Sequence, residues 1–223
     1  MNILCLIIVP QKKIPDLQSV TLPNGKRSYT LPDGSSVPSV TTVLGAMKKK
    51  AIMEWRRRVG EEEANRISKK ATGRGTNVHK ICENYLNNEK DYLKGIMPDA
   101  IEMFHSIKPY LNKINNIHYQ EQALWSAQLQ MAGRVDCIAE YEGVLSVIDF
   151  KTSRKVKSHE DIEDYFWQTS AYALMYEELV GIPIHDLVII MAVEDNKPLI
   201  FKQKTEDHID GLVKAIDYYR KNG

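Results

Sequence analysis

The pattern of apolar and polar positions divides the chain into a central group of strands with helices before and after it. Apolar or alternating runs predict strands at residues 117 to 129 and in both halves of residues 133 to 155. Two further strands are predicted at residues 187 to 193 and 199 to 204, joined by a polar turn. Helical periodicity predicts helices over about residues 41 to 70, 97 to 114, 159 to 180 and 206 to 221.

This order of elements favours an α/β fold with a central mixed sheet flanked by helices. Before it, turn signals at residues 23 to 25 and 32 to 34 predict small hairpins, with Ser39 or Thr41 capping the helix that follows. That helix is expected to break near Gly60, and Thr72-Gly73-Arg74-Gly75-Thr76 is expected to be a loop or cap before a helix ending near Leu86. The apolar ILCLIIV at residues 3 to 9 predicts a buried strand.

The composition indicates the general class of protein but not its function. The chain has 223 residues, 43% of them apolar and 26% charged, with a net charge of +1, a balance typical of one globular domain. We therefore expect a single domain over residues 1–223, with an N-terminal extension at 1–70 and a core at 71–223. The extension is rich in lysine and arginine, which fits either a phosphate-contacting surface or a solvated, salt-bridged face.

Three cysteines, Cys5, Cys82 and Cys137, lack the spacing of a zinc site and are too few to ligate a typical iron–sulfur cluster. We therefore expect a reduced, intracellular protein without such a cluster. No run of residues approaches the length of a membrane span, so we expect no membrane partner.

Charged residues interrupt the strands of 133 to 155. If Glu142-Gly143 forms a two-residue turn, Asp136 lies directly opposite Asp149, and Lys151 shares the face of Asp149. Two close carboxylates repel each other unless a cation lies between them, and carboxylate oxygens are typical ligands of Mg²⁺. The alternative is a pair of exposed strand-end acids with a lysine counter-ion, but the apolar neighbours favour burial.

These residues carry a family resemblance. Gly133-x-Val135-Asp136, Ile148-Asp149-Phe150-Lys151-Thr152 and Gln168-x-x-x-Tyr172 resemble the RecB-like branch of the PD-(D/E)XK nuclease superfamily. Upstream segments resemble the mitochondrial genome maintenance exonucleases and their phage-encoded relatives. These segments are Pro38-Ser39-Val40-Thr41, Trp55-Arg56, Arg74-Gly75-Thr76 and His79-x-x-x-Glu83. Val135 replaces the proline that gives the superfamily its name, as is usual in this branch.

The resemblance implies a restriction-endonuclease-like core and a metal-dependent hydrolase. It implies that Asp136, Asp149, His79 and the backbone carbonyl of Phe150 ligate Mg²⁺ or Mn²⁺, and that Lys151 orients or activates the attacking water. For His79, the alternative is a capping or core histidine.

Most of the further candidates have two interpretations. The resemblance implies that Gln168 and Tyr172 lie at the site; otherwise they satisfy buried backbone groups. Glu83 would orient His79, and Glu121 would line the site or be a solvated strand residue. Substrate phosphates would contact Arg74, Thr152, Ser153, Arg154 and Lys155, although the residues after Lys151 also fit a solvated loop.

We therefore expect an Mg²⁺-dependent exodeoxyribonuclease that acts on single-stranded DNA or DNA ends, with replication or recombination proteins as partners. The alternatives are a structure-specific or restriction-like endonuclease of the same fold, and a nucleic-acid-binding module without catalysis. Because the first residues do not resemble a transit or signal peptide, a bacterial or phage-infected cytoplasm is the expected location.

Overall fold

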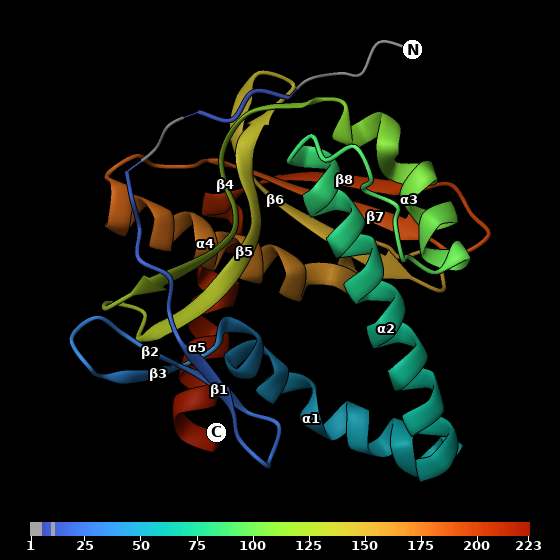
Figure 1. The fold of residues 1–223 in the computed structure, drawn as a ribbon. Helices are drawn as coiled ribbons and strands as arrows, with labels where there is room; N and C mark the ends of the chain where they lie inside the picture. Colours follow the sequence, from blue (N-terminus) through green and yellow to red (C-terminus); the bar gives the residue numbers. More distant parts are fainter. Residues whose placement is uncertain (1–5, 10–11) are drawn as a thin grey trace.

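A five-stranded mixed sheet forms the centre of the protein in the computed structural model, which describes residues 6–9 and 12–223 (Figure 1). The sheet confirms the prediction from the sequence. Strands β6 and β7 run parallel, and the other neighbouring strands run antiparallel. In their order across the sheet, the strands are β4 (Ile114–Ser126), β5 (Met131–Tyr141), β6 (Val144–Ser153), β7 (Asp186–Val193) and β8 (Leu199–Lys204).

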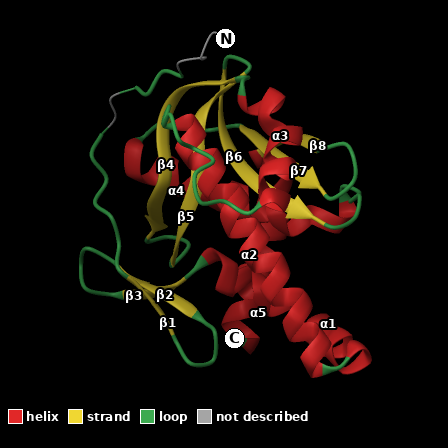
Figure 2. Cartoon of the chain, turned by 45° about the vertical axis from the view of Figure 1, so that its right-hand side comes forward, coloured by secondary structure: helices red, strands yellow, loops and turns green. Residues whose placement is uncertain are grey.

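Helices cover both faces of this sheet (Figures 1 and 2). Helices α2 and α3 pack on one face through buried side chains such as Ile81 and Phe104. Helices α1, α4 and α5 pack on the other face, around residues such as Val43 and Tyr176. The helices are α1 (Val40–Val59), α2 (Glu61–Leu86), α3 (Pro98–Leu111), α4 (Glu163–Val180) and α5 (Ile209–Asn222), with 3₁₀ turns at Glu160–Ile162 and Thr205–His208.

The predicted hairpins form a separate three-stranded antiparallel sheet of β1 (Ser19–Thr21), β2 (Arg27–Thr30) and β3 (Ser36–Pro38). Ser39 caps α1, as predicted: its hydroxyl accepts a hydrogen bond from the Thr42 amide at 3.0 Å. The cap fixes the start of α1 beside the small sheet.

The predicted break at Gly60 is confirmed, because Gly60 has a φ of 86° between α1 and α2. The predicted loop at residues 72–76 is wrong: these residues continue α2 without interruption. Glycine is tolerated there because the helix buries Val78 and Ile81 in the core, and tertiary packing outweighs the weak helix propensity of two glycines.

The predicted N-terminal strand is only partly described, since residues 1–5, including Cys5, and residues 10–11 lie outside the described residues. In the described part, Ile8 forms one isolated bridge to Ile117. Leu6 is buried in the core, but Ile7 and Ile8 are 54% and 53% exposed, so the expectation of a fully buried strand is wrong for this part. Within residues 6–9 and 12–223, no helix has the length and apolar character needed to span a membrane.

Candidate active site

The candidate site lies where strands β5 and β6 separate. Glu142 and Gly143 both have positive φ, as in a type I′ turn, and Tyr141 pairs with Val144 as predicted. The ladder keeps this register up to the Cys137–Ile148 pair and ends there. Beyond it, β5 continues to pair with β4, and β6 continues to pair with β7. Asp136 and Asp149 are the first residues past the last pair, so both lie at the fork.

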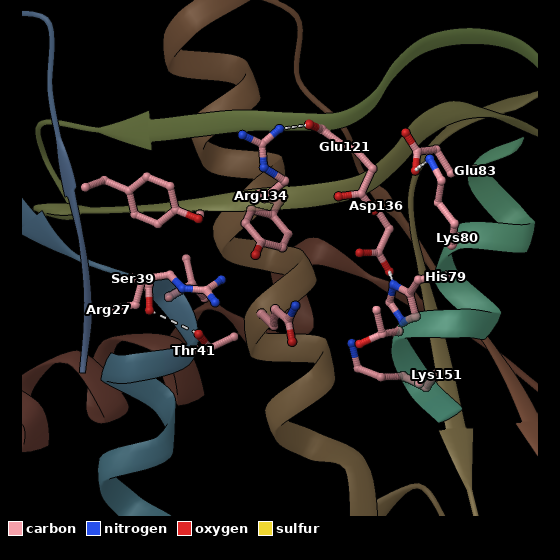
Figure 3. Close-up of a pocket in the computed structure, with 17 residues that line it drawn as sticks. Arg27, Ser39, Thr41, His79, Lys80, Glu83, Glu121, Arg134, Asp136 and Lys151 are labelled. Atoms are coloured by element: carbon pink, nitrogen blue, oxygen red, sulfur yellow. Dashed lines mark hydrogen bonds and ion pairs between the residues drawn. The ribbon is translucent and has the colours of Figure 1, made fainter. Parts of the chain in front are cut away.

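Three metal-ligating side chains meet at this fork (Figure 3). His79 of α2, Glu121 of β4 and Asp136 of β5 each offer a ligand atom, and these atoms all lie within 4.8 Å of one another. His79 Nδ1 is 3.4 Å from Asp136 Oδ2, and the same carboxylate oxygen accepts a 2.8 Å hydrogen bond from the Phe150 amide. An imidazole with two carboxylates is a donor set that fits a divalent cation.

Asp149 and Lys151 form a second group beside this cluster. Asp149 is only 1% exposed, and its carboxylate is paired with the Lys151 ammonium. Gln168 of α4 donates to the other carboxylate oxygen at 3.3 Å. The Lys151 Nζ also lies 4.9 Å from the centroid of the Tyr165 ring. The lysine is therefore held between a buried carboxylate and an aromatic face.

The pKa values of these side chains depend on one another. Burial alone would lower the pKa of His79, but the adjacent Asp136 carboxylate raises it to about 9. Burial raises the pKa of Glu121 to about 7, and the negative charge of Asp136 adds to the shift. Burial likewise raises the pKa of Asp149 to about 6, against the opposing effect of Lys151. Without a bound cation, the cluster therefore retains protons near neutral pH.

The backbone of β4 directs Glu121 into the site. Gln120 pairs with Cys137 and Gln122 pairs with Val135, which leaves Glu121 directly across from Asp136. Glu121 has a φ of 45°, in the left-handed region that is unfavourable for a non-glycine residue. Arg134 donates a hydrogen bond to the Glu121 carbonyl and so supports this conformation. Strained residues of this kind cluster at functional sites.

Gly133 lets α4 approach β5 closely. A Cβ at this position would lie 2.8 Å from both Cε1 and Oη of Tyr172. The buried Tyr172 ring therefore rests directly on the strand that carries Asp136, one helical turn from Gln168. The close contact between Gly133 and the Tyr172 ring explains why this strand needs a glycine.

The comparisons with known proteins agree with this geometry. A family model described as the PD-(D/E)XK nuclease superfamily matches residues 45–216. The chain belongs to this superfamily. Its mixed sheet, with acids and a lysine at the fork of two strands, is the nuclease fold that the sequence predicted.

The similar proteins include "Mitochondrial genome maintenance exonuclease 1" of Mus musculus and of Xenopus tropicalis. The mouse protein is 28% identical over 74% of this chain and 52% of its own length. The frog protein is 28% identical over 85% of this chain and 61% of its own length. This chain thus spans about half to three fifths of the relatives it matches.

A solved structure from Eubacterium rectale, provisionally named an exonuclease, is 12% identical and covers 69% of this chain and 68% of its own. Its TM-score to this chain is 0.45.

Some residues expected from the nuclease motifs lie away from the cleft. Arg74 is buried and forms an ion pair with Glu194 at 2.9 Å, lining a different cavity beside the turn after β7. The structure therefore does not bring Arg74 to the cluster, contrary to the expectation of a substrate contact. Thr152 lies against α2, where a Cβ at Gly75 would be 3.6 Å from its hydroxyl oxygen.

The segment after Lys151 is tied down by local bonds. Ser153 Oγ donates to the carbonyl of Lys155 at 2.6 Å and accepts from its amide at 3.2 Å. Arg154 is exposed, with its Nε 3.8 Å from Glu194. The side chains of Arg154 and Lys155 stay at the surface near the end of β6, so a phosphate contact there remains a prediction.

The cleft itself is a cavity of about 540 Å³ between α2, the sheet and the start of α1. Glu83 also lines the cleft, where it pairs with Lys80 at 3.1 Å. It is not part of the metal-ligand cluster, which His79, Glu121 and Asp136 form. Several further lining residues were not predicted from the sequence. Arg27, Tyr29 and Thr41 line the cleft because of how the small sheet and α1 are placed, and Lys80 and Arg134 line it from α2 and β5.

Proposed function

We propose that this chain is a divalent-metal-dependent exonuclease that hydrolyses phosphodiester bonds at single-stranded DNA ends. One observation carries the proposal: the cluster of His79, Glu121 and Asp136 adjoins the buried Asp149–Lys151 pair at the fork of β5 and β6. The names of the mitochondrial exonuclease relatives support the choice of an exonuclease.

The residues present fit a hard divalent cation such as Mg²⁺ or Mn²⁺. His79, Glu121 and Asp136 would hold it, and we retain Asp149 and the Phe150 carbonyl as further ligands because they adjoin Asp136. When bound, the cation would neutralise charge on the scissile phosphate and make a water molecule nucleophilic at neutral pH. Burial and the charge of Asp136 raise the pKa of Asp149 to about 6 even with Lys151 beside it, so a bound cation would further stabilise this carboxylate.

Lys151 would act through its positive charge. Burial opposes that charge, but Asp149 and Asp136 keep the pKa of Lys151 above its ordinary value. The side chain therefore stays an ammonium near neutral pH and offers N–H donors rather than a base. In the cleft it would orient the attacking water and stabilise the charge that builds on the phosphate oxygens.

The remaining residues would position this group. Gln168 holds the Asp149 carboxylate from α4, and Tyr172 holds β5 from the same helix. Glu83 would orient Lys80 at the rim of the cleft. Arg27 is exposed in the cleft wall and would contact the phosphates of the incoming strand.

The proposal is tested with linear and circular single-stranded DNA of the same sequence. With Mg²⁺, the linear strand is expected to be degraded and the circle to remain intact, and a chelator is expected to abolish degradation of the linear strand. Cleavage of the circle would favour the endonuclease alternative. Degradation that continues in chelator would exclude the metal-dependent mechanism.

A further inference from the structure

A second groove lies beside the catalytic cleft, between the β1–β2 turn, α1 and the end of α5. It has a volume of about 420 Å³, and Thr41 lines both it and the cleft. The adjacent residues Arg27 and Lys26 face the cleft and the groove respectively. The two spaces therefore meet at the first turn of α1, where Thr41 lines both.

Hydrogen bonds fix the walls of this groove. The Arg27 amide donates to the Thr42 hydroxyl oxygen at 3.0 Å, and that hydroxyl lies 3.2 Å from the Arg27 carbonyl. Together with the Ser39 cap, these bonds hold strand β2 against α1. The groove is thus part of the fold, since its two sides are joined by specific contacts.

The chemistry of the groove suits an unpaired nucleic-acid strand. Lys26 and Lys49 supply positive charge. Among the described residues no Asp or Glu side chain lines the groove, and Gly223, the last of these residues, lines its far end. The Lys26 ammonium lies 5.7 Å from the centroid of the Tyr219 ring, so a cation and an aromatic surface adjoin. Ile52 and Met53, 48% and 54% exposed, add an apolar floor. Proteins bind single strands with this combination of cations for phosphates and flat apolar surfaces for bases.

We infer that this groove is a second substrate subsite, which holds an unpaired segment of the strand whose end lies in the catalytic cleft. This inference rests on the proposed function for the identity of the strand. Lys49 lies eight residues after Thr41, which places it about 12 Å further along α1. The subsite would therefore bind nucleotides away from the scissile bond and favour long single strands over short ones.

The test measures binding of fluorescently labelled single-stranded DNA by anisotropy, in chelator so that cleavage does not interfere. Oligonucleotides of about 16 and about 4 nucleotides span the lengths that single nucleic-acid-binding folds cover. The test variant is the double substitution Lys26→Glu/Lys49→Glu. The control is Lys90→Glu/Lys94→Glu, which makes the same charge change at exposed lysines outside both cavities.

The test variant is expected to bind the long strand about tenfold more weakly than the control, with a much smaller penalty for the short strand. Loss of two phosphate contacts should also reduce the slope of log K against log salt by about 1.4. Equal losses in both variants, equal losses for both lengths, or no binding by the unmodified protein would overturn the inference. Binding with the expected pattern but no Mg²⁺-dependent cleavage would instead contradict the proposed function.

Discussion

The protonation state of the His79–Glu121–Asp136 cluster gives the strongest quantitative prediction. Metal ligands must be deprotonated, so protons compete with the cation. The pKa values of about 9 for His79 and about 7 for Glu121 lie above the ordinary values of these groups. Competition is therefore strong at neutral pH and weakens as pH rises. The prediction concerns the affinity of the cluster for a divalent cation when the pH is raised from 7 to 8.

The expected magnitude follows from these two pKa values. At pH 7, protonation of His79 reduces the apparent affinity about 100-fold and that of Glu121 reduces it about twofold. At pH 8, the corresponding factors are about 10 and about 1. Mn²⁺ should therefore bind about 15- to 20-fold more tightly at pH 8, and binding at pH 7 should release about 1.5 protons.

Isothermal titration calorimetry with Mn²⁺ measures both quantities when each titration is repeated in two buffers with different heats of ionisation. The variant His79→Asn removes one titrating group. Its affinity should change only about twofold between pH 7 and 8, with release of about 0.5 protons. An affinity that does not change with pH in the unmodified protein, or a proton release unaffected by the substitution, would refute the reasoning.

Three further substitutions test other parts of the site. Lys151→Ala should reduce kcat about 10²- to 10³-fold, as removal of a preorganised charge does at other sites. Anisotropy in chelator should show that the variant still binds DNA. A cleavage rate near that of the unmodified protein would exclude the assigned role. Gly133→Ala places a Cβ 2.8 Å from Tyr172 and should destabilise the fold by about 1–3 kcal/mol, measured by urea unfolding. The control is Gly73→Ala in α2, where nothing lies within 4 Å; it should stabilise by about 0.5–1 kcal/mol, and equal effects would contradict the close-approach argument. Arg74→Ala breaks an ion pair whose carboxylate is partly exposed. The free energy of unfolding should therefore fall by about 2 kcal/mol, less than for a fully buried pair. An unchanged free energy of unfolding would show that the pair contributes little.

The hairpin that carries the site was predictable because its information is local. Strand alternation and a two-residue turn fix the register of β5 and β6, and the register holds up to the fork. Glu142 is an unusual first residue for this turn. The structure explains its presence, since Lys113 and Lys202 both pair with its carboxylate.

The sequence alone could not decide whether Glu121 lines the site or faces solvent, because its position depends on the register between β4 and β5. That register shifts between Asn115 and Tyr119, and an irregularity of this kind moves every later side chain. The Arg74-Gly75 motif was misjudged for a related reason. Two nearby glycines suggest a loop, but the packing of Val78 and Ile81 in the core keeps this segment helical.

The positions of Arg27 and Lys26 also depend on tertiary structure, since the small sheet docks on α1 through hydrogen bonds distant in sequence. The single-domain organisation, the location in the cell and the partner proteins remain predictions from the sequence.

A crystal soaked in Mn²⁺ tests the central claim most directly, because anomalous scattering locates the ion without reference to activity. We predict an anomalous peak in contact with His79, Glu121 and Asp136, beside the Asp149–Lys151 pair. Absence of a peak in this cluster at saturating Mn²⁺, or a peak bound only elsewhere on the protein, would contradict a metal-dependent nuclease site at the fork of β5 and β6.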